Sequence, residues 1–283
     1  MLRWLFPKKN ENQKNEIKKI QEKKFDNNDA KIILREIREE FGLDFSNKKE
    51  ITIEKMKNFA IQHDIYSFTD LREQLLHSHH FKNDLINKLT VGETYFFRET
   101  AQFEILVKLM KKKRIRRILC IPCSSGEEVY TIVLYILAHQ TDLSGMEIVG
   151  VDINSDRIEQ AKRGCYSSRS IQQVPTLLKE KYFYQEDVFH CVDDILKQHV
   201  SFKQMNIFNS EIFSLGKFDV IFCRNLLYYF DEEHKSKAIE IFDRLLRDSG
   251  VLFLGHADLI SENKLFTKVT ENDGKTYYIK ASK

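Results

Sequence analysis

Residues 118–152 read ILCIPCSSGEEVYTIVLYILAHQTDLSGMEIVGVD and decide the fold. A short apolar run over 118–121 is followed by a Ser-Gly turn and a helical pattern over 127–139. A second apolar run, 147–151, then ends in Asp152. Short apolar strands that alternate with helices predict a parallel sheet covered by helices.

The same alternation continues to the end of the chain. We predict further helices over 102–113, 155–163 and 232–246 and further strands over 218–223, 251–254, 265–269 and 276–279. An Asp-Gly pair at 273–274 predicts that the last two strands form an antiparallel hairpin. The stretch of about 166–204 breaks the alternation and predicts a β-rich insertion. Residues 99–283 therefore predict an α/β domain, and a parallel sheet with a final hairpin resembles the arrangement of Rossmann-like methyltransferases.

The N-terminal part of the chain has a different pattern. Residues 29–98 contain amphipathic runs at helical spacing, behind Asp29 and over 53–63, 68–77 and 81–89, so they predict an all-helical domain. Before it, residues 1–24 hold eight Lys or Arg against three Glu. We expect 1–28 to be a flexible basic extension.

Composition excludes several classes of protein. The chain has 283 residues, 45 basic and 42 acidic, and 42% hydrophobic residues, which is typical of a globular protein without a dedicated nucleic-acid surface. The longest apolar run, 132–138, is too short to cross a membrane. Five cysteines without a regular spacing predict reduced thiols. Cys120 and Cys123 have no second Cys/His pair at zinc-binding spacing, so no metal is expected.

Candidate site residues follow the predicted strands. In parallel sheets, ligands bind where the carboxyl ends of the strands meet. Glu127, behind the Ser-Gly turn, favours a cationic or amine-bearing ligand such as S-adenosylmethionine over a phosphate. Asp152 either accepts hydrogen bonds from ribose hydroxyls or caps the next helix.

Two more segments contain polar residues that we expect near the carboxyl ends of the strands. In LTVGETYFFRET (89–100), Thr94 and Arg98 are four residues apart and could share a helical face. Arg98 either binds a cofactor carboxylate or pairs with a neighbouring Glu. In FDVIFCRNLLYYFD (218–231), polar residues follow a buried strand, namely Arg224, Asn225, Tyr228 and Tyr229.

Five motifs, in this order, resemble those of the chemotaxis receptor methyltransferase (CheR) family. LTVGETYFFRE is similar to T-x-N-E-T-x-F-F-R-E, CSSGEEVYTI to G-C-S-S-G-E-E-P-Y-S, and VDINSDRIEQAKRGCY to D-I-D-…-L-x-x-A-R-x-G-x-Y. FDVIFCRNLLYYFD resembles F-D-x-I-F-C-R-N-V-L-I-Y-F-D, and GVLFLGHAD resembles G-x-L-F-x-G-H-S-E. The family has an N-terminal helical domain and an α/β methyltransferase domain with a small inserted β-subdomain, as the patterns above predict.

The resemblance implies a role for each matched residue. Thr94 and Arg98 would contact S-adenosylmethionine, Glu127 its amino group, Asp152 its ribose, and Asn206 and Ile207 its adenine. Arg224 and Asn225 would lie near the cofactor and the reaction centre. For the methyl transfer itself, we expect either Arg224 or the pair Tyr228 and Tyr229 to orient the substrate carboxylate. The chain departs from the pattern at four positions, with Gly92 for a cofactor-binding Asn, Pro122 for Gly, Val129 for Pro and Asp258 for Glu.

The activity implied by the resemblance is methylation of glutamate side chains in the cytoplasmic helical region of chemotaxis receptors. A cytoplasmic monomer would perform it with neither metal nor catalytic base, because a glutamate carboxylate is already ionised at neutral pH. Two alternatives stay open: a regulatory or scaffold relative that binds the cofactor, and a methyltransferase for another protein or a small molecule.

Overall fold

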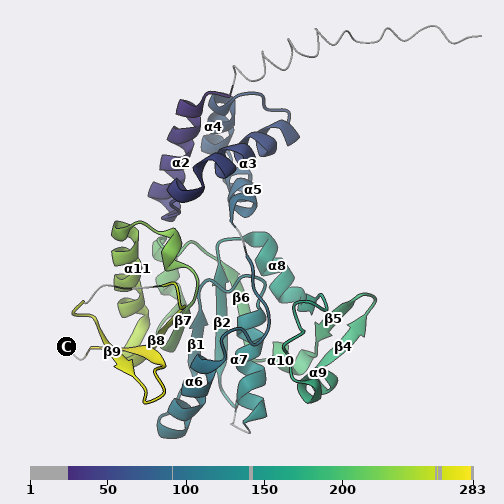
Figure 1. Cartoon of the computed structure of the whole chain (residues 1–283), viewed down its shortest axis with the longest axis vertical. Coiled ribbons are helices and arrows are strands. Elements are labelled where there is room, and N and C mark those ends of the chain that lie inside the picture. The colour runs from purple at the N-terminus through teal and green to yellow at the C-terminus, as the bar shows by residue number, and fades with distance from the viewer. Residues whose placement is uncertain (1–24, 91, 140–142, 259, 261–262, 282–283) are drawn as a thin grey trace, which may run out of the picture. The chain divides into compact units, whose positions relative to one another are not determined.

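The computed structural model describes residues 25–90, 92–139, 143–258, 260 and 263–281. Most of the predicted basic extension, 1–24, lies outside these residues. The chain divides into two compact units, one reaching Leu89 and the other starting at Thr90 and including Phe41–Leu43 (Figure 1). Residues 90–98, which the sequence pattern assigned to the helical domain, thus belong to the α/β unit. No described helix is long and apolar enough to span a bilayer.

The first unit consists of helices, as predicted. They are α2 (Asn27–Phe41), the 3-10 turn η1 (Ser46–Lys48), α3 (Lys49–Gln62), α4 (Phe68–His77) and α5 (His79–Leu89). Their apolar faces form a core whose fully buried members include Met56, Phe68 and Leu71. The Ser67 hydroxyl accepts a hydrogen bond from the Asp70 amide at 3.0 Å, which caps α4.

The second unit is built on a seven-stranded sheet in the order β6-β2-β1-β7-β8-β10-β9. Its strands are β1 (Arg117–Cys120), β2 (Glu147–Asp152), β6 (Val200–Gln204), β7 (Phe218–Cys223), β8 (Leu246–Leu254), β9 (Phe266–Thr270) and β10 (Thr276–Lys280). The first five are mutually parallel, and β9 and β10 form the predicted antiparallel hairpin.

Helices cover both faces of this sheet. They are α6 (Ala101–Lys112), α7 (Glu127–Ala138), α8 (Ser155–Arg163) and α11 (Glu232–Leu245). The chain steps from β1 to β2 to β6 in one direction and from β7 to β8 in the other, so right-handed crossovers place α7 and α8 on one face and α11 on the opposite face. Phe103 of α6 and Val129 of α7 share one buried apolar cluster with strand residues such as Ile118 and Phe222.

The inserted element is smaller than the sequence pattern predicts. It comprises β3 (Cys165–Tyr166), α9 (Thr176–Tyr182), β4 (Phe183–Glu186) and β5 (Phe189–Val192), with the strands in the order β3-β5-β4. The short helix α10 (Asp194–Lys197) follows it. The prediction that the insertion extends to 204 is wrong, because 200–204 form β6, which pairs with β2 at the edge of the main sheet.

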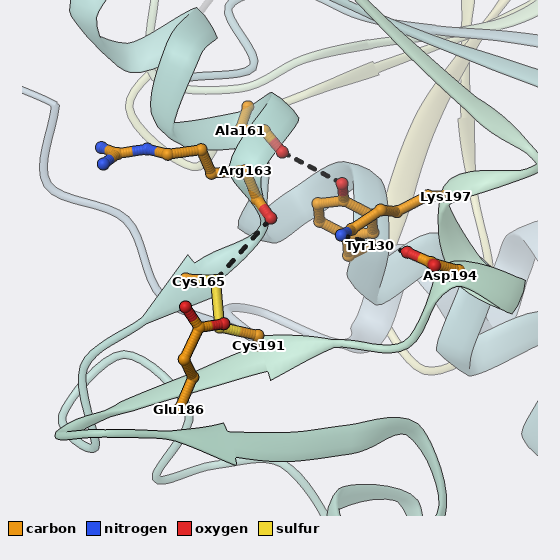
Figure 2. Close-up of a disulfide and its surroundings, with 8 residues drawn as sticks. All are labelled: Tyr130, Ala161, Arg163, Cys165, Glu186, Cys191, Asp194 and Lys197. Atoms are coloured by element: carbon orange, nitrogen blue, oxygen red, sulfur yellow. Dashed lines mark hydrogen bonds and ion pairs between the residues drawn. A yellow bond between two sulfur atoms is a disulfide. The ribbon is translucent and has the colours of Figure 1, made fainter.

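The prediction of reduced thiols is wrong for two of the five cysteines. Cys165 and Cys191 lie directly opposite each other on β3 and β5 and form a disulfide (Figure 2). They are 26 residues apart in the sequence, and the antiparallel pairing brings them together. Cys120, Cys123 and Cys223 are free and buried, as expected of reduced cysteines.

Candidate functional site

The carboxyl ends of five strands meet at one edge of the main sheet. The last residue of β2, Asp152, is in register with Gln204 of β6, and Cys223 of β7 with Leu254 of β8. The loops that follow these strands carry most of the predicted site residues. Ser124 and Asn225 in these loops have positive φ values of 46° and 64°, in a region that non-glycine residues seldom adopt.

Asp152 is buried at the end of β2. Its Oδ2 accepts a hydrogen bond from the Ser124 amide at 2.8 Å and its Oδ1 one from the Asn154 amide at 2.9 Å. The helix cap that follows belongs to Asn154, whose side chain accepts from the Arg157 amide at 3.1 Å. Burial raises the pKa of Asp152 and the amide donors oppose that rise. Each carboxylate oxygen keeps acceptor capacity for a ligand hydroxyl.

Glu127 starts α7 directly after Gly126, whose φ of 91° suits glycine. Its carboxylate accepts hydrogen bonds from the Ser125 hydroxyl at 2.7 Å and the Ser170 hydroxyl at 2.9 Å. Burial raises the pKa of Glu127, while the two serines and the charge of Arg157 oppose that rise. A buried acid with hydroxyl donors on both oxygens is a suitable partner for a ligand amine.

A cavity of about 540 Å³ lies beside Glu127. Its lining includes Gly92, Thr94, Ser125, Arg157, Cys165 and Ser170. The volume is in the range of small-molecule sites. The cavity therefore unites three predicted site positions, Gly92, Thr94 and Glu127.

A second, narrow cavity of about 40 Å³ adjoins Asp152. Asn206 and Ile207, predicted to flank adenine, line it together with Pro122, Leu226 and Phe230. This space admits little more than a water molecule. An adenine ring therefore fits here only if side chains such as Ile207 and Phe230 move apart.

The segment 92–100 is a loop, so the predicted helical face shared by Thr94 and Arg98 is wrong. The chain is irregular over 92–95 and then turns, with φ values of 61° at Phe97 and 52° at Glu99 that a right-handed helix excludes. The Phe96 amide donates to the Ser170 carbonyl at 3.0 Å. The Phe97 amide donates to the Thr131 hydroxyl at 3.1 Å. These bonds hold the loop against α7 and the segment that follows β3.

Arg98 stays within its own loop. Its guanidinium donates to the Glu93 carbonyl at 3.0 Å and lies 3.8 Å from the Glu99 carboxylate. The side chain is 29% exposed. The pairing with Glu99, one of the two alternatives open from the sequence, is therefore present. A cofactor contact by Arg98 requires its guanidinium to exchange these partners.

Arg224 is buried at the end of β7 and its guanidinium bonds three protein groups. It donates to Glu128 Oε2 at 2.7 Å, to the Arg98 carbonyl at 2.7 Å and to Glu99 Oε2 at 3.2 Å. Burial raises the pKa of the Glu128 carboxyl, and the charge of Arg224 opposes this rise. The guanidinium thus ties β7 to α7 and to the loop 92–100.

Glu128 and Asp258 were absent from the predicted site. Consecutive residues of a helix point about 100° apart, and of the pair 127–128 only Glu127 lines the large cavity. This helical geometry could have indicated from the sequence that Glu128 has a separate role. Asp258, on the loop after β8, accepts hydrogen bonds from the amides of Asn225 and Tyr228. It therefore orders the loop that carries the predicted Arg224-Asn225 pair and the two tyrosines.

The rings of Tyr228 and Tyr229 pack against each other at a tilt of 36°, with their centroids 4.1 Å apart. Tyr228 is 45% exposed, so its ring is available to a substrate. Partial burial and the neighbouring Tyr229 raise the pKa of the Tyr228 phenol. This phenol therefore stays protonated and can donate a hydrogen bond at neutral pH.

Gly92 provides a test of the loop's fit. A Cβ atom at this position would lie 2.7 Å from the Ser124 hydroxyl and 2.9 Å from Arg157 Nε. We expect Gly92→Asn to weaken binding of S-adenosylhomocysteine about fivefold to tenfold in calorimetry, because overpacking costs on the order of 1 kcal/mol or more. Gly145→Asn is the control for an added side chain, because this glycine is exposed and the nearest atom to an added Cβ, in the Arg116 side chain, would lie 3.7 Å away. Tighter binding by the Gly92→Asn protein would show instead that the asparagine restores a missing hydrogen bond.

Comparison with known proteins fits this geometry. Residues 92–275 match the family model described as CheR methyltransferase, SAM binding domain. The chain is 39% identical over 244 residues to a chemotaxis protein methyltransferase of Campylobacter jejuni, covering 85% of this chain and 92% of that protein. It is also 39% identical over 259 residues to chemotaxis protein methyltransferase 2 of Vibrio cholerae, covering 86% and 89%.

A solved structure of a SAM-dependent methyltransferase from Geobacter sulfurreducens with S-adenosyl-L-homocysteine covers 61% of this chain and 54% of that one. Its TM-score of 0.34 and identity of 16% are too low to bear on the site. The match to the family model, by contrast, contains the loop 92–100 and the strand-end loops after β1, β2, β6, β7 and β8. With these residues in place, the chain belongs to the CheR methyltransferase family.

Proposed function

We propose that this protein transfers a methyl group from S-adenosylmethionine to glutamate carboxylates in the cytoplasmic helical region of chemotaxis receptors. The family domain binds S-adenosylmethionine, and the relatives are chemotaxis protein methyltransferases. The observation that carries the proposal is the sheet edge itself. Two buried acids, Glu127 at the start of α7 and Asp152 at the end of β2, follow neighbouring strands there, and the loop after β7 at the same edge carries Tyr228 and Tyr229. We further propose that a cytoplasmic monomer performs the reaction.

The residues present suit the cofactor. Glu127 would hold its amino group, Asp152 its ribose hydroxyls, and Asn206 and Ile207 its adenine. The serine hydroxyls on Glu127 and the amide donors on Asp152 support both carboxylates in their charged form. Thr94, which lines the large cavity, and Arg98 on the same loop would contact the rest of the cofactor, as would Asn225.

The methyl transfer requires few catalytic groups from the protein. When bound, the cofactor would supply an activated methyl group, and the new bond from a carboxylate oxygen to the methyl carbon would replace the bond from sulfur to that carbon. A glutamate nucleophile has an ordinary pKa of about 4.3 and arrives ionised, which makes a general base unnecessary. The protein's task is to align the two groups and exclude water.

We assign the substrate contact to the tyrosines and a positioning role to Arg224. The Tyr228 phenol can donate a hydrogen bond to an incoming carboxylate, and the Tyr229 ring packs against the Tyr228 ring. The Arg224 guanidinium is committed to Glu128, Glu99 and the Arg98 carbonyl, so it would act on the substrate only through the loop that it holds. A tight guanidinium grip on the carboxylate would also stabilise the ground state and slow transfer.

The proposal predicts a base-labile product and a rate that is nearly independent of pH between 6 and 8. Labelled cofactor and receptor-containing membranes of the source organism should yield protein label that mild alkali releases as methanol. The rate stays flat because the substrate carboxylate is ionised and the Tyr228 phenol is protonated throughout this range. Chelators should have no effect.

The matched control is His256→Ala. His256 is exposed on the loop after β8 and is the histidine nearest in sequence to Asp258. We expect this variant to keep the wild-type rate and pH profile. A rate that rises through pH 6–7 in the wild type and is lost in His256→Ala would show a catalytic base. Base-stable label on lysine or arginine would identify a different protein methyltransferase.

A further inference from the structure

We propose that Cys165 and Cys191 form a thiol–disulfide exchange site, and that its oxidation state controls the order of the cofactor-cavity wall. The partners of this site are low-molecular-weight thiols and disulfides. The inference rests on the cavity beside Glu127 serving the cofactor, and it goes beyond methyl transfer itself.

The two cysteines differ in accessibility. Cys191 of β5 is fully buried, whereas Cys165 of β3 is partly exposed and lines the large cavity. Figure 2 shows the disulfide joining the two strands, with the Glu186 side chain beside it. The three remaining cysteines are buried, and burial raises the pKa of each thiol, so they react slowly. A small thiol therefore has one open point of attack in the described chain, the Cys165 sulfur.

The cavity wall starts at this cysteine. Helix α8, which presents Arg157 and Gln160 to the cavity, ends at Arg163, and Cys165 follows after one glycine. The next residues continue the wall as Ser167, Arg169, Ser170, Gln172 and Gln173. The disulfide therefore fixes the start of the segment 165–173, which continues the cavity lining after the end of α8.

Hydrogen bonds connect the same segment to the site. The Tyr166 hydroxyl donates to the Ser125 carbonyl at 2.7 Å, and the Ser170 hydroxyl donates to Glu127 at 2.9 Å. The Ser170 carbonyl accepts from the Phe96 amide at 3.0 Å. Reduction removes the covalent link and leaves Cys165 attached to β5 only through the backbone pairing of β3 with β5. The segment then has more conformational freedom, which weakens its hold on Glu127 and on the loop 92–100.

The two sulfurs differ in their surroundings as well as in their accessibility. Its carboxylate lies 3.6 Å from the Cys191 sulfur. In the reduced protein this carboxylate is placed to accept the Cys191 thiol hydrogen, whereas Cys165 is the partly exposed thiol that a small disulfide reaches first. Cys165 is therefore the nucleophile when the pair is oxidised, and Cys191 is the thiol that completes the disulfide.

The exchange balances as follows. In reduction, one thiolate of a dithiol attacks the Cys165 sulfur, the bond between the two protein sulfurs breaks, and Cys191 leaves with the electron pair and takes up a proton. The second thiolate of the dithiol then attacks the mixed disulfide and releases Cys165, which is protonated in turn. Two electrons and two protons pass to the protein, and the dithiol leaves as its disulfide.

The full-length protein tests the inference through two separate readouts. Equilibration with glutathione disulfide, followed by denaturation, should leave three reactive thiols of the five, and dithiothreitol should restore all five. Peptide mapping without reductant should link Cys165 to Cys191. In calorimetry, the reduced protein should bind S-adenosylhomocysteine threefold to tenfold more weakly than the oxidised protein, as expected for the loss of about one hydrogen bond.

The variants separate the pair from the other cysteines. Cys165→Ser/Cys191→Ser should bind like the reduced protein and show no response to dithiothreitol, whereas Cys120→Ala should retain the full response. Five reactive thiols after glutathione disulfide would overturn the inference. Equal affinity of the two forms would also overturn it, even where receptor methylation proceeds normally. One zinc ion per reduced chain, lost in Cys165→Ser, would make the pair and Glu186 a metal site instead.

Discussion

Replacing Arg224 by alanine is expected to lower the free energy of unfolding by about 3–5 kcal/mol. The Arg224 side chain is 3% exposed, and its guanidinium neutralises Glu128, whose side chain is 13% exposed. Its removal leaves a buried carboxylate without a cation and deprives the Arg98 carbonyl of its donor. Glu99, 40% exposed, can turn to solvent and contributes less. Urea denaturation at neutral pH measures the loss.

A surface pair provides the control for this experiment. Arg247 lies 3.0 Å from Asp219 and is 48% exposed, so Arg247→Ala should cost less than about 1 kcal/mol. Arg224→Met combined with Glu128→Leu should recover most of the stability, because it removes both charges and keeps apolar volume. Equal losses for Arg224→Ala and Arg247→Ala would show that the Arg224 guanidinium reaches solvent and is free for substrate.

Local sequence patterns were sufficient for three of the five parallel strands, β1, β2 and β7, and for the hairpin. β7 was predicted with its observed bounds because all its residues but one are buried, and the Asp-Gly turn specified the pairing of β9 with β10. Two strands were misjudged. β6 carries polar residues because it lies at the edge of the sheet, and β8 begins within a polar stretch directly after α11. Their positions depend on pairing with β2 and β7, which no local pattern reveals.

For the candidate site, too, the sequence predicted the location of the residues but not their partners. Parallel strands end at one edge, so the sequence order alone places Ser124, Asp152 and Arg224 near one another. The partners of these residues come from distant segments, since Arg224 and Glu128 are 96 residues apart and Asn225 and Asp258 are 33 apart. The left-handed turns at Phe97 and Glu99 also gave no signal, because neither residue type favours a positive φ.

Asp152→Ala is expected to weaken binding of S-adenosylhomocysteine by tenfold to a hundredfold in calorimetry. Hydrogen bonds from ligand hydroxyls to a carboxylate contribute about 1.5–3 kcal/mol, and tenfold corresponds to about 1.4 kcal/mol. The substitution also removes the acceptor of the Ser124 and Asn154 amides, so the turn that leads to Glu127 is held less firmly.

Asp156→Ala, at an exposed residue of α8 four positions away, is the matched control and should leave the affinity for S-adenosylhomocysteine within twofold. Asp152→Asn separates the contribution of the charge from that of the hydrogen bond. The asparagine side chain keeps one acceptor oxygen for the ligand but carries no charge. An affinity for Asp152→Ala equal to that of the control would exclude Asp152 from the cofactor site and place the ribose elsewhere along the sheet edge.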